Sequence, residues 1–336
     1  MSRQSFIDAV LGKPSPRVAD VPSARIPVFG SGTSVACVDL MKATGASFPQ
    51  AHLDAQVMAD LAIGGHTILG LDVVMPLYSV CHEVAALGCP IDWGNPTAMP
   101  DSKPIWSSAG DIRIPPDFLK HPACKVPLDA IAILRKRLGS DAAICGKAFG
   151  PWTLAYHLFG VEKFLVGTLD DPGETNRILE RLLPVTVAFA KAQLDAGADV
   201  MCIPDHATSD LCSPAAYREF LIPVHSQLAH MVPAPTLLHI CGNTSDRVAM
   251  VAQTGINCLH WDTKSGPPEK MRSLAGEKLS LMGGVSNMML LGGKPEEVQA
   301  AAAHAHQAGI NIIGPECAIP LRTPIENLKA IARIRE

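Results

Sequence analysis

GETNRILERLLPVTVAFAKAQLDAGADVMCIPDH, residues 173–206, is the stretch that decides the fold. Its first part, residues 173–196, places apolar residues at helical spacing, and Gly197 follows where a left-handed residue commonly ends a helix. The run Asp199–Pro204 is short and apolar, as expected of a strand that is buried on both faces. A helix followed directly by such a strand is one unit of a parallel α/β sheet.

The same alternation continues along the chain in both directions. Eight short apolar runs rich in Val and Ile are the expected strands: Ile26–Phe29, Asp72–Leu77, Ala142–Ala148, Asp199–Pro204, Thr236–Ile240, Asn257–Trp261, Leu279–Gly283 and Asn311–Gly314. The expected helices between them are Pro49–Ile63, Leu128–Leu138, Gly173–Ala196, Pro214–Met231, Thr244–Gln253, Pro295–Gln307 and one that starts near Pro324. Eight such units predict an α/β fold, a single (β/α)8 barrel over residues 1–336.

Two further features of the chain refine this expectation. Residues 81–122 are rich in Gly, Pro, Trp and Ser and are too long for one βα loop, so we expect an excursion that covers one end of the barrel. Ser213, Asp171 and Thr323 each precede a proline, which predicts that they cap the helices that follow.

Composition excludes several classes of function. The chain is 48% hydrophobic and 18% charged with a net charge of −4, and its Lys and Arg residues are scattered, so a nucleic acid is not an expected partner. No stretch reaches the length of a membrane span, and the first residues do not resemble a signal peptide, so we expect a cytoplasmic protein. Ten cysteines spread along such a chain predict buried thiols rather than disulfides.

The reactive side chains fall at the ends of the expected strands, where barrels build their active sites. Four runs end in such residues: Asp205 and His206, His239 and Cys241, Asp262, and Glu316 and Cys317. Alternate residues of a strand point the same way, so His239 and Cys241 can face one metal ion, and Cys317 could reach them across the barrel mouth. An imidazole and two thiolates suit Zn²⁺ and leave a fourth position open for a substrate.

Other interpretations of these residues remain open. Eight cysteines beyond this pair make a chance pairing easy, so His239, Cys241 and Cys317 could instead be a surface histidine and two buried thiols. Asp205 and His206 could orient a substrate, or the aspartate could simply cap a helix. Gly283 and Gly284 would allow a cofactor or the backbone to approach closely, because glycine has no side chain.

Longer motifs resemble one family. HICGNTSDRV at 239–248 and GPECAIPLRTPIENLKAI at 314–331 are similar to segments of the methylcobamide:coenzyme M methyltransferases, within the uroporphyrinogen decarboxylase superfamily. GPWTLAYHLFG at 150–160, GADVMCIPDHATSDLCSP at 197–214 and TGASFPQAHLDAQVMADLA at 44–62 agree, so the resemblance spans nearly the whole chain. It implies a (β/α)8 barrel of the uroporphyrinogen decarboxylase type.

The resemblance also implies a chemistry. Zinc would be held by His239, Cys241 and Cys317, with Asp262 as a further ligand when no thiol is bound, and it would activate a thiol as its thiolate. The methyl group would come from a methylated corrinoid, and since the chain has no Asp-x-His-x-x-Gly cobalamin motif, that corrinoid should arrive on a separate protein. Coenzyme M or a similar small thiol is the expected acceptor, and tetrahydrofolate is the alternative.

Three observations concern the alternative functions, which are a decarboxylase and a non-catalytic barrel, and the binding of a sulfonate acceptor. Uroporphyrinogen decarboxylases hold the acidic porphyrin with an Arg-Gln-Ala-Gly-Arg stretch, which is replaced here by FGSGT at 29–33. A non-catalytic barrel that only carries a corrinoid protein would have a structural zinc with four protein ligands, or none. A sulfonate acceptor would need a cation or a helix N-terminus, for which Arg322 and the Gly242–Thr244 turn are the candidates.

Overall fold

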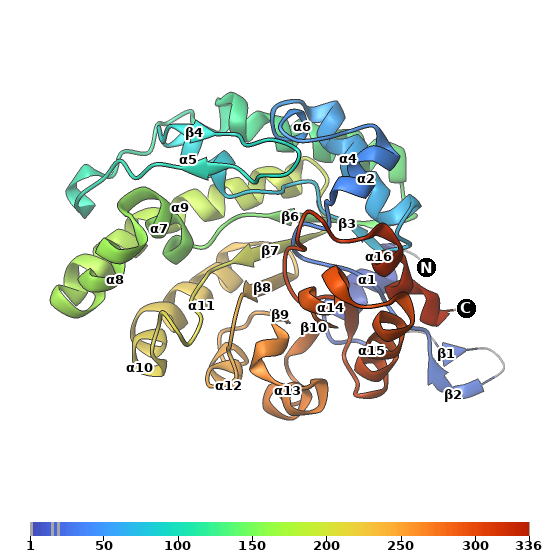
Figure 1. Cartoon of the computed structure of the whole chain (residues 1–336). Helices are drawn as coiled ribbons and strands as arrows, with labels where there is room; N and C mark the ends of the chain where they lie inside the picture. Colours follow the sequence, from blue (N-terminus) through green and yellow to red (C-terminus); the bar gives the residue numbers. More distant parts are fainter. Residues whose placement is uncertain (1–2, 15–16, 19–20, 336) are drawn as a thin grey trace.

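The computed structural model describes residues 3–14, 17–18 and 21–335 and is built around one curled parallel sheet (Figure 1). Its seven strands follow the order β11-β10-β9-β8-β7-β6-β3. They are β3 Val73–Val74, β6 Ala143–Lys147, β7 Val200–Pro204, β8 Thr236–Ile240, β9 Cys258–Trp261, β10 Ser280–Val285 and β11 Ile312–Pro315. Each lies within or overlaps an expected run, and all the ladders of this sheet are parallel, so the predicted parallel sheet is confirmed.

The first expected run closes the barrel without forming a full strand. Ile313 N–H donates to Val28 (2.8 Å), and Gly30 N–H donates to the carbonyl of Ile313 (3.0 Å). On the other side Asp72 N–H donates to the carbonyl of Phe29 (2.8 Å), and Phe29 N–H donates to the Asp72 carboxylate (2.8 Å). The segment 28–30 therefore occupies the eighth position, between β11 and β3, as in a (β/α)8 barrel.

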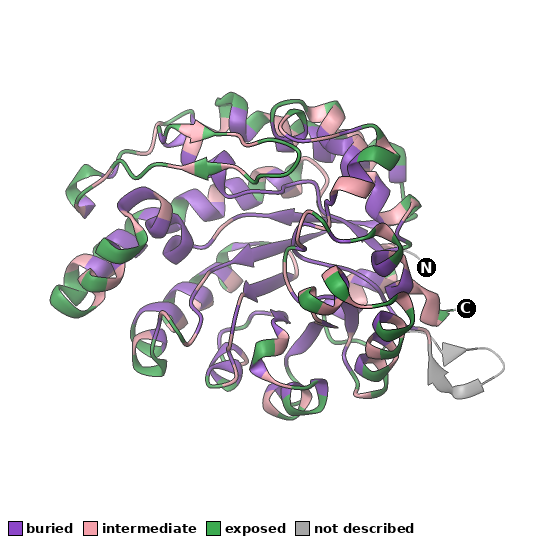
Figure 2. Ribbon diagram, viewed as in Figure 1, coloured by how far each residue is buried: buried purple, intermediate pink, exposed green. Residues whose placement is uncertain are grey.

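Helices cover the outside of the sheet, and the strands beneath them are buried (Figure 2). The longer ones are α4 Ala55–Thr67, α6 Pro122–Leu138, α8 Val161–Asp170, α9 Pro172–Asp195, α11 Ile222–Met231 and α15 Pro295–Gln307. Shorter ones are α1 Arg3–Val10, α2 Val38–Thr44, α3 Gln50–Leu53, α5 Cys81–Ala86, α7 Pro151–Phe159, α10 Pro214–Ala216, α12 Val248–Val251, α13 Pro268–Ala275, α14 Asn287–Gly292 and α16 Ile325–Ala332. Across the described residues, none of the helices is both long and apolar enough to span a membrane.

Helix α1 packs under the amino end of the barrel. Arg3 donates to the carboxylate of Asp199 (2.6 Å), and the Ser280 hydroxyl donates to the carbonyl of Ala9 (2.7 Å). Asp199 and Ser280 lie at the amino ends of their strands. Helix α1 therefore covers part of the amino end of the barrel.

The segment 81–122 runs between β3 and β6. It contains α5, the antiparallel pair β4 Ile91–Asp92 and β5 Asp101–Ser102, and the 3-10 turns η1 Ala109–Asp111 and η2 Phe118–Lys120. Ile105 and Trp106 both donate their N–H groups to the carbonyl of Leu158, and Ser102 pairs with the ring of His157 (2.7 Å). This segment therefore packs against α7, which begins directly after β6. A second antiparallel pair, β1 Arg17–Val18 with β2 Val21–Arg25, precedes the closing segment.

The helix caps were predicted with mixed success. Ser213 and Asp171 accept hydrogen bonds from Ala216 N–H (3.1 Å) and Glu174 N–H (2.8 Å), so both caps are confirmed. The cap at Thr323 is wrong, because Pro324 is extended and α16 begins one residue later than the pattern indicates. Among the described atoms, the Thr323 hydroxyl has no hydrogen-bond partner.

Three expected helices also have different bounds. Pro49–Ile63 is interrupted at Asp54, which is extended and caps α4 by accepting from Val57 N–H (2.9 Å). Pro214–Met231 contains a π-helical turn, η3 Tyr217–Leu221, between α10 and α11. Thr244–Gln253 is reduced to α12, because the Asn243 side chain accepts from Ser245 N–H (3.0 Å) and competes with helical bonding.

Barrel closure gives a test of stability. A Cβ built on Gly314 would lie 1.8 Å from the carbonyl oxygen of Gly30, where backbone meets backbone and cannot yield. We expect Gly314→Ala to lower the free energy of unfolding by about 1–3 kcal/mol or more, which is the usual cost of overpacking. Denaturant titrations measure this change.

Gly292→Ala is the matched control, because nothing lies within 4 Å of its Cβ position in α14. It should leave stability unchanged or raise it by up to about 1 kcal/mol. Equal destabilisation by the two variants would contradict the role of Gly314 in closure.

Candidate metal centre and its cavity

A cavity of about 200 Å³ opens at the carboxyl ends of the strands. Side chains from the ends of β6, β7, β8 and β11 line it, together with Thr33 and Tyr78. The lining includes five of the residues predicted at the strand ends: Asp205, His206, His239, Cys241 and Cys317. The expected position of the site at the barrel mouth therefore coincides with a real cavity.

His239, Cys241 and Cys317 converge in this cavity. The Nε2 atom of His239 lies 3.0 Å from Cys241 Sγ and 3.3 Å from Cys317 Sγ, and the two sulfur atoms are 3.1 Å apart. Within the described part of the chain, this is the one group of three or more potential ligands gathered within 4.8 Å. The β8 ladder presents His239 and Cys241 on the same side, and the loop after β11 brings Cys317 across.

The three donor atoms fit a tetrahedral zinc ion. Zn–S bonds of about 2.3 Å and Zn–N bonds of about 2.0 Å would place them about 3.5–3.8 Å apart, so small outward rotations of the side chains suffice. The Nδ1 atom of His239 donates to the carbonyl of His260 (3.2 Å), which leaves the Nε2 lone pair aimed at the sulfur atoms. Such a hydrogen bond behind a histidine is typical of metal ligands.

The thiols of Cys241 and Cys317 differ in pKa. A hydrogen bond from Cys241 holds the pKa of Cys317 well below the ordinary value, and the same bond raises the pKa of Cys241. Cys241 and Cys317 are also the partly exposed members of the ten cysteines, and the other eight are buried. Cys317 is therefore the more acidic thiol of the pair.

Two carboxylates near the centre are occupied by backbone donors. Asp262 accepts from Gly242 N–H and Lys264 N–H, both at 2.9 Å, and lies outside the His, Cys, Cys group. Glu316 accepts from Asn287 N–H (2.7 Å) and from the N–H (2.9 Å) and hydroxyl of Thr263. Asp262 thus fixes the turn after Cys241, and Glu316 ties the end of β11 to the loops that follow β9 and β10.

Asp205 is completely buried and belongs to a chain of hydrogen bonds. It accepts from Thr153 N–H (2.7 Å) and from Nε2 of His225 (3.1 Å), whose Nδ1 accepts from the Tyr217 hydroxyl (2.9 Å). The next residue, His206, is partly exposed in the cavity, and burial lowers its pKa, so its ring is neutral. Sequence reasoning missed His225 and Tyr217, which lie on helices rather than at strand ends.

The two glycines of β10 pack against protein. Both have positive φ, 130° at Gly283 and 98° at Gly284. A Cβ on Gly283 would lie 2.9 Å from the carbonyl oxygen of Trp261, and one on Gly284 would lie 2.7 Å from the Cβ of Ala305 in α15. Neither glycine lines the cavity.

Lys147 is a cavity residue that the strand-end survey did not single out. It is the last residue of β6 and its side chain is 3% exposed. The sequence does contain a signal for it, because Lys147 is a charged residue inside an otherwise apolar strand run. That run was correctly predicted as a buried strand, and its lysine was not considered as a site residue.

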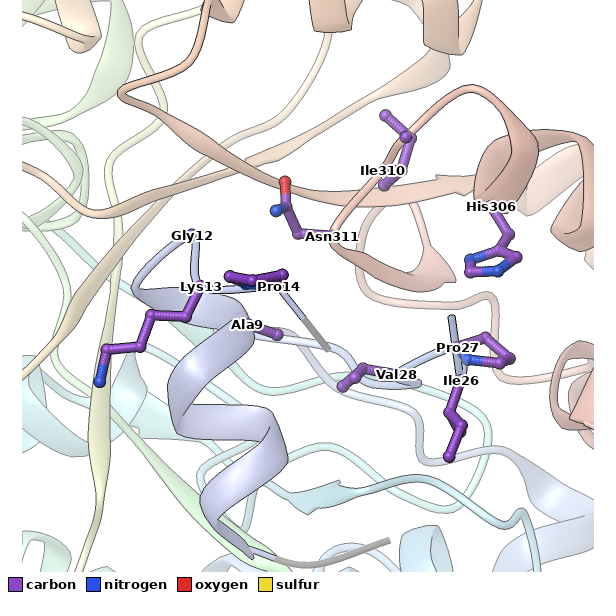
Figure 3. A pocket seen from close by; sticks show the side chains of 11 residues that line it. Ala9, Gly12, Lys13, Pro14, Ile26, Pro27, Val28, His306, Ile310 and Asn311 are labelled. Carbon is purple, nitrogen blue, oxygen red and sulfur yellow. The ribbon is translucent and has the colours of Figure 1, made fainter. Parts of the chain in front are cut away.

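A larger cavity, of about 310 Å³, lies at the opposite end of the barrel (Figure 3). Ala9, Lys13, Val28, His306 and Asn311 are among the residues that line it, and Asn311 directly precedes β11. Barrel enzymes place their chemistry at the carboxyl ends, and no cluster of potential metal ligands lies here among the described residues. The smaller cavity is therefore the candidate site.

The fold and the site together define a (β/α)8 barrel with a His, Cys, Cys centre at its carboxyl end. The uroporphyrinogen decarboxylase (URO-D) family matches residues 2–336. The chain therefore belongs to the uroporphyrinogen decarboxylase family, as the sequence motifs indicated.

Sequence and structural similarity to individual relatives is more specific than the family match. The chain is 33% identical to a methylated-thiol–coenzyme M methyltransferase of Methanosarcina mazei, over 97% of this chain and 86% of the relative. It is 32% identical to a methylcobamide:CoM methyltransferase of Methanosarcina barkeri, over 94% of each. A solved structure, a methyltransferase from Methanosarcina mazei, superposes with a TM-score of 0.93 at 32% identity, over 99% of this chain and 97% of that one.

The lowered pKa of Cys317 can be tested by chemical labelling. In chelator-treated protein at pH 7, we expect iodoacetamide to label Cys317 before the other nine cysteines, because it alone has a lowered pKa and partial exposure. Its labelling rate, followed by mass spectrometry, should reach its plateau well below the pH at which ordinary thiols do.

Cys241→Ala removes the hydrogen-bond donor and should slow the labelling of Cys317 at pH 7 by about tenfold or more, as its pKa rises. Cys241→Ser keeps a donor and is the control, with a rate closer to that of the wild type. Equal rates in the alanine and serine variants would show that the hydrogen bond does not set this pKa.

Proposed function

We propose that this chain is a zinc-dependent methyltransferase that moves a methyl group from a methylated corrinoid protein to a small thiol. The observation that carries the proposal is the convergence of His239, Cys241 and Cys317 in a cavity at the barrel mouth. It is supported by relatives whose names specify methyl transfer to coenzyme M and, in one case, from methylcobamide.

His239, Cys241 and Cys317 would hold the zinc ion, which when bound converts a thiol to its reactive thiolate at neutral pH. The two cysteines balance the metal's charge as thiolates, so an incoming sulfur keeps its nucleophilic character. In the overall reaction the thiol loses its proton and its sulfur bonds to the methyl carbon. The bond to cobalt breaks, and its electron pair stays with the corrinoid.

The remaining residues of the cavity position the reactants. Asp205, held by His225 and Thr153, fixes the end of β7 and thereby the ring of His206. His206 also borders a second cavity of about 310 Å³, lined by residues 101–104 and by α7. We place the approach of the corrinoid protein on this side, because an incoming group there would meet the metal cavity across a single side chain.

The cavity favours a small acceptor. Its volume of about 200 Å³ is below the about 300–1,000 Å³ typical of pockets for drug-sized ligands, so a thiol of a few atoms fits better than a folate. Lys147 is the one Lys or Arg among its lining residues, whereas a porphyrin with many carboxylates needs a cluster of cations. These features support thiol methylation over folate methylation and over decarboxylation.

The metal assignment predicts zinc contents. Cys241→Ala and Cys317→Ala should each lose zinc, with an affinity loss beyond the about 10–100-fold caused by losing a supporting partner of a ligand. Cys89→Ala, outside the site, should bind one zinc per chain. Full occupancy in both site variants, measured by elemental analysis, would defeat the assignment.

Asp262→Asn tests the fourth ligand. It removes the charge and keeps an oxygen for one of the two backbone donors, Gly242 N–H or Lys264 N–H. Without thiol we expect its zinc affinity to fall less than in the two cysteine variants, because three other atoms converge and Asp262 lies outside them. With thiol present it should match the wild type. A loss as large as that of Cys241→Ala would make Asp262 a full ligand.

The reaction can be followed with free methylcobalamin, whose visible spectrum changes when the methyl group leaves. Zinc-loaded protein should turn over with coenzyme M and show no turnover with tetrahydrofolate. Turnover with tetrahydrofolate and with none of the thiols would overturn the acceptor while leaving the zinc site intact.

A further inference from the structure

Lys147 is held firmly at the edge of the candidate site. Its residue pairs with Cys202 in the β6–β7 ladder. Its N–H donates to the side-chain oxygen of Gln193 (2.8 Å), and its carbonyl accepts from the side-chain nitrogen of Gln193 (2.8 Å). With the backbone fixed in this way, the side chain enters the same cavity as Cys317.

The ammonium group of Lys147 has no acceptor in the described structure. No hydrogen bond or ion pair of the described residues includes its Nζ atom, although the residue is 3% exposed. Its nearest recorded neighbour is the ring of Phe149, with the centroid at 5.3 Å. Buried lysines are rare unless they are paired, because removing an ammonium group from water is costly. The Nζ atom of Lys147 is not among the fully buried polar atoms without a partner, so it reaches the open cavity, where a ligand can pair with it.

The groups around Lys147 do not supply that anion. Glu83 is fully buried, and one of its oxygens accepts from Phe149 N–H (3.0 Å) while the other has no hydrogen-bond partner among the described residues. Burial raises the pKa of Glu83 to about 8, so it is mainly a neutral acid at pH 7. Burial lowers the pKa of Lys147 to about 8, so it remains mainly charged.

The neighbouring thiols do not supply it either. Burial raises the pKa of Cys145 to about 12 and that of Cys202 well above the ordinary value, so both are protonated. Glu83, Cys145 and Cys202 therefore leave the Lys147 ammonium without a counter-ion of their own. Cys317, whose pKa is lowered, also acts on Lys147 across the cavity, but in the proposed function it is a ligand of the metal.

We propose that Lys147 binds the anionic end of the acceptor, so that the site selects small thiols that carry a sulfonate or carboxylate a few bonds from the sulfur. This inference rests on the proposed function. The sulfur-binding groups come from β8 and the loop after β11, and the cation comes from β6, so a short molecule anchored at both ends crosses the cavity. Fixing both ends orients the sulfur toward the incoming methyl group.

The cations and N–H groups that the sequence offered for this task lie elsewhere. Arg322 is exposed and does not line the cavity. In the Gly242–Thr244 turn, Gly242 N–H is used by Asp262 and Thr244 N–H donates to the Ser265 hydroxyl (2.9 Å). Lys147 is thus the one Lys or Arg of the cavity lining, and its ammonium group is unpaired among the described residues.

The test compares three thiols of similar size: 2-mercaptoethanesulfonate, 3-mercaptopropionate and the neutral 2-mercaptoethanol. Steady-state methyl transfer from methylcobalamin is measured for the wild type, for Lys147→Met and for Lys264→Met. Methionine keeps the unbranched shape and most of the length of the lysine side chain without its charge. Lys264 is the matched control because it is an exposed lysine beside Asp262, outside the cavity lining.

In Lys147→Met we expect the KM for the preferred anionic thiol to rise about 10–100-fold, the size of a lost charge-assisted hydrogen bond. The KM for 2-mercaptoethanol and the kcat for all thiols should change by less than about twofold, which also shows that the variant is folded. Whichever anionic thiol shows the larger rise identifies the head group. Lys264→Met should keep the wild-type preference.

Three outcomes overturn the inference. The first is a wild type without preference for anionic thiols, and the second is an equal KM rise for neutral and anionic thiols in Lys147→Met. The third is an equal change in Lys264→Met, which would show that the overall electrostatic field of the protein sets the preference for anionic thiols. If the wild type methylates no thiol, the proposed function fails by itself. Calorimetric titration with ethanesulfonate then still decides the role of Lys147, because binding lost in Lys147→Met supports it and equal binding refutes it.

Discussion

Closure of the barrel by residues 28–30 is the constraint on which the rest of the structure depends. This short segment satisfies the open edges of β11 and β3 at once, through Ile313 on one side and Asp72 on the other. Without it the sheet would end in two unpaired edges and could flatten. The curvature that closure imposes carries the loop after β11 across the mouth, and Cys317 thereby meets His239 and Cys241, which lie three strands away in the sheet.

The charged groups at the mouth divide into two kinds. The carboxylates of Asp205, Asp262 and Glu316 each accept hydrogen bonds from backbone N–H groups of neighbouring loops, so they fix the shape of the rim. The groups left free to meet a ligand are an imidazole, two thiols and the ammonium of Lys147. Under the proposed function, these are the groups that would receive a small acidic thiol.

The two ends of the barrel illustrate why volume alone does not identify a site. The cavity beside α1 is the larger, yet its lining includes one lysine and one histidine without a shared focus. The cavity at the carboxyl end is smaller, but side chains from several strand ends converge in it because parallel strands all deliver their last residues to the same rim. Convergence of reactive groups is a property of strand direction, and volume is not.

The amino-acid sequence by itself determined the parallel sheet, the end of the barrel at which the reactive residues gather, and the candidate metal ligands His239, Cys241 and Cys317. It could do so because buried parallel strands are short apolar runs, and residues two apart on a strand share a face. It could not determine the roles of Asp262 and Glu316, whose backbone partners lie in other loops.

The sequence alone could not identify Lys147 either. A lysine in a strand run is an unpaired cation at a cavity only when no carboxylate from another element pairs with it. The same holds for Gly283 and Gly284, whose missing side chains make room for Trp261 and Ala305. Local pattern specifies which elements form and which way their side chains alternate. Which atoms share a hydrogen bond or a cavity is decided by contacts between distant segments, and only the closed barrel brings those segments together.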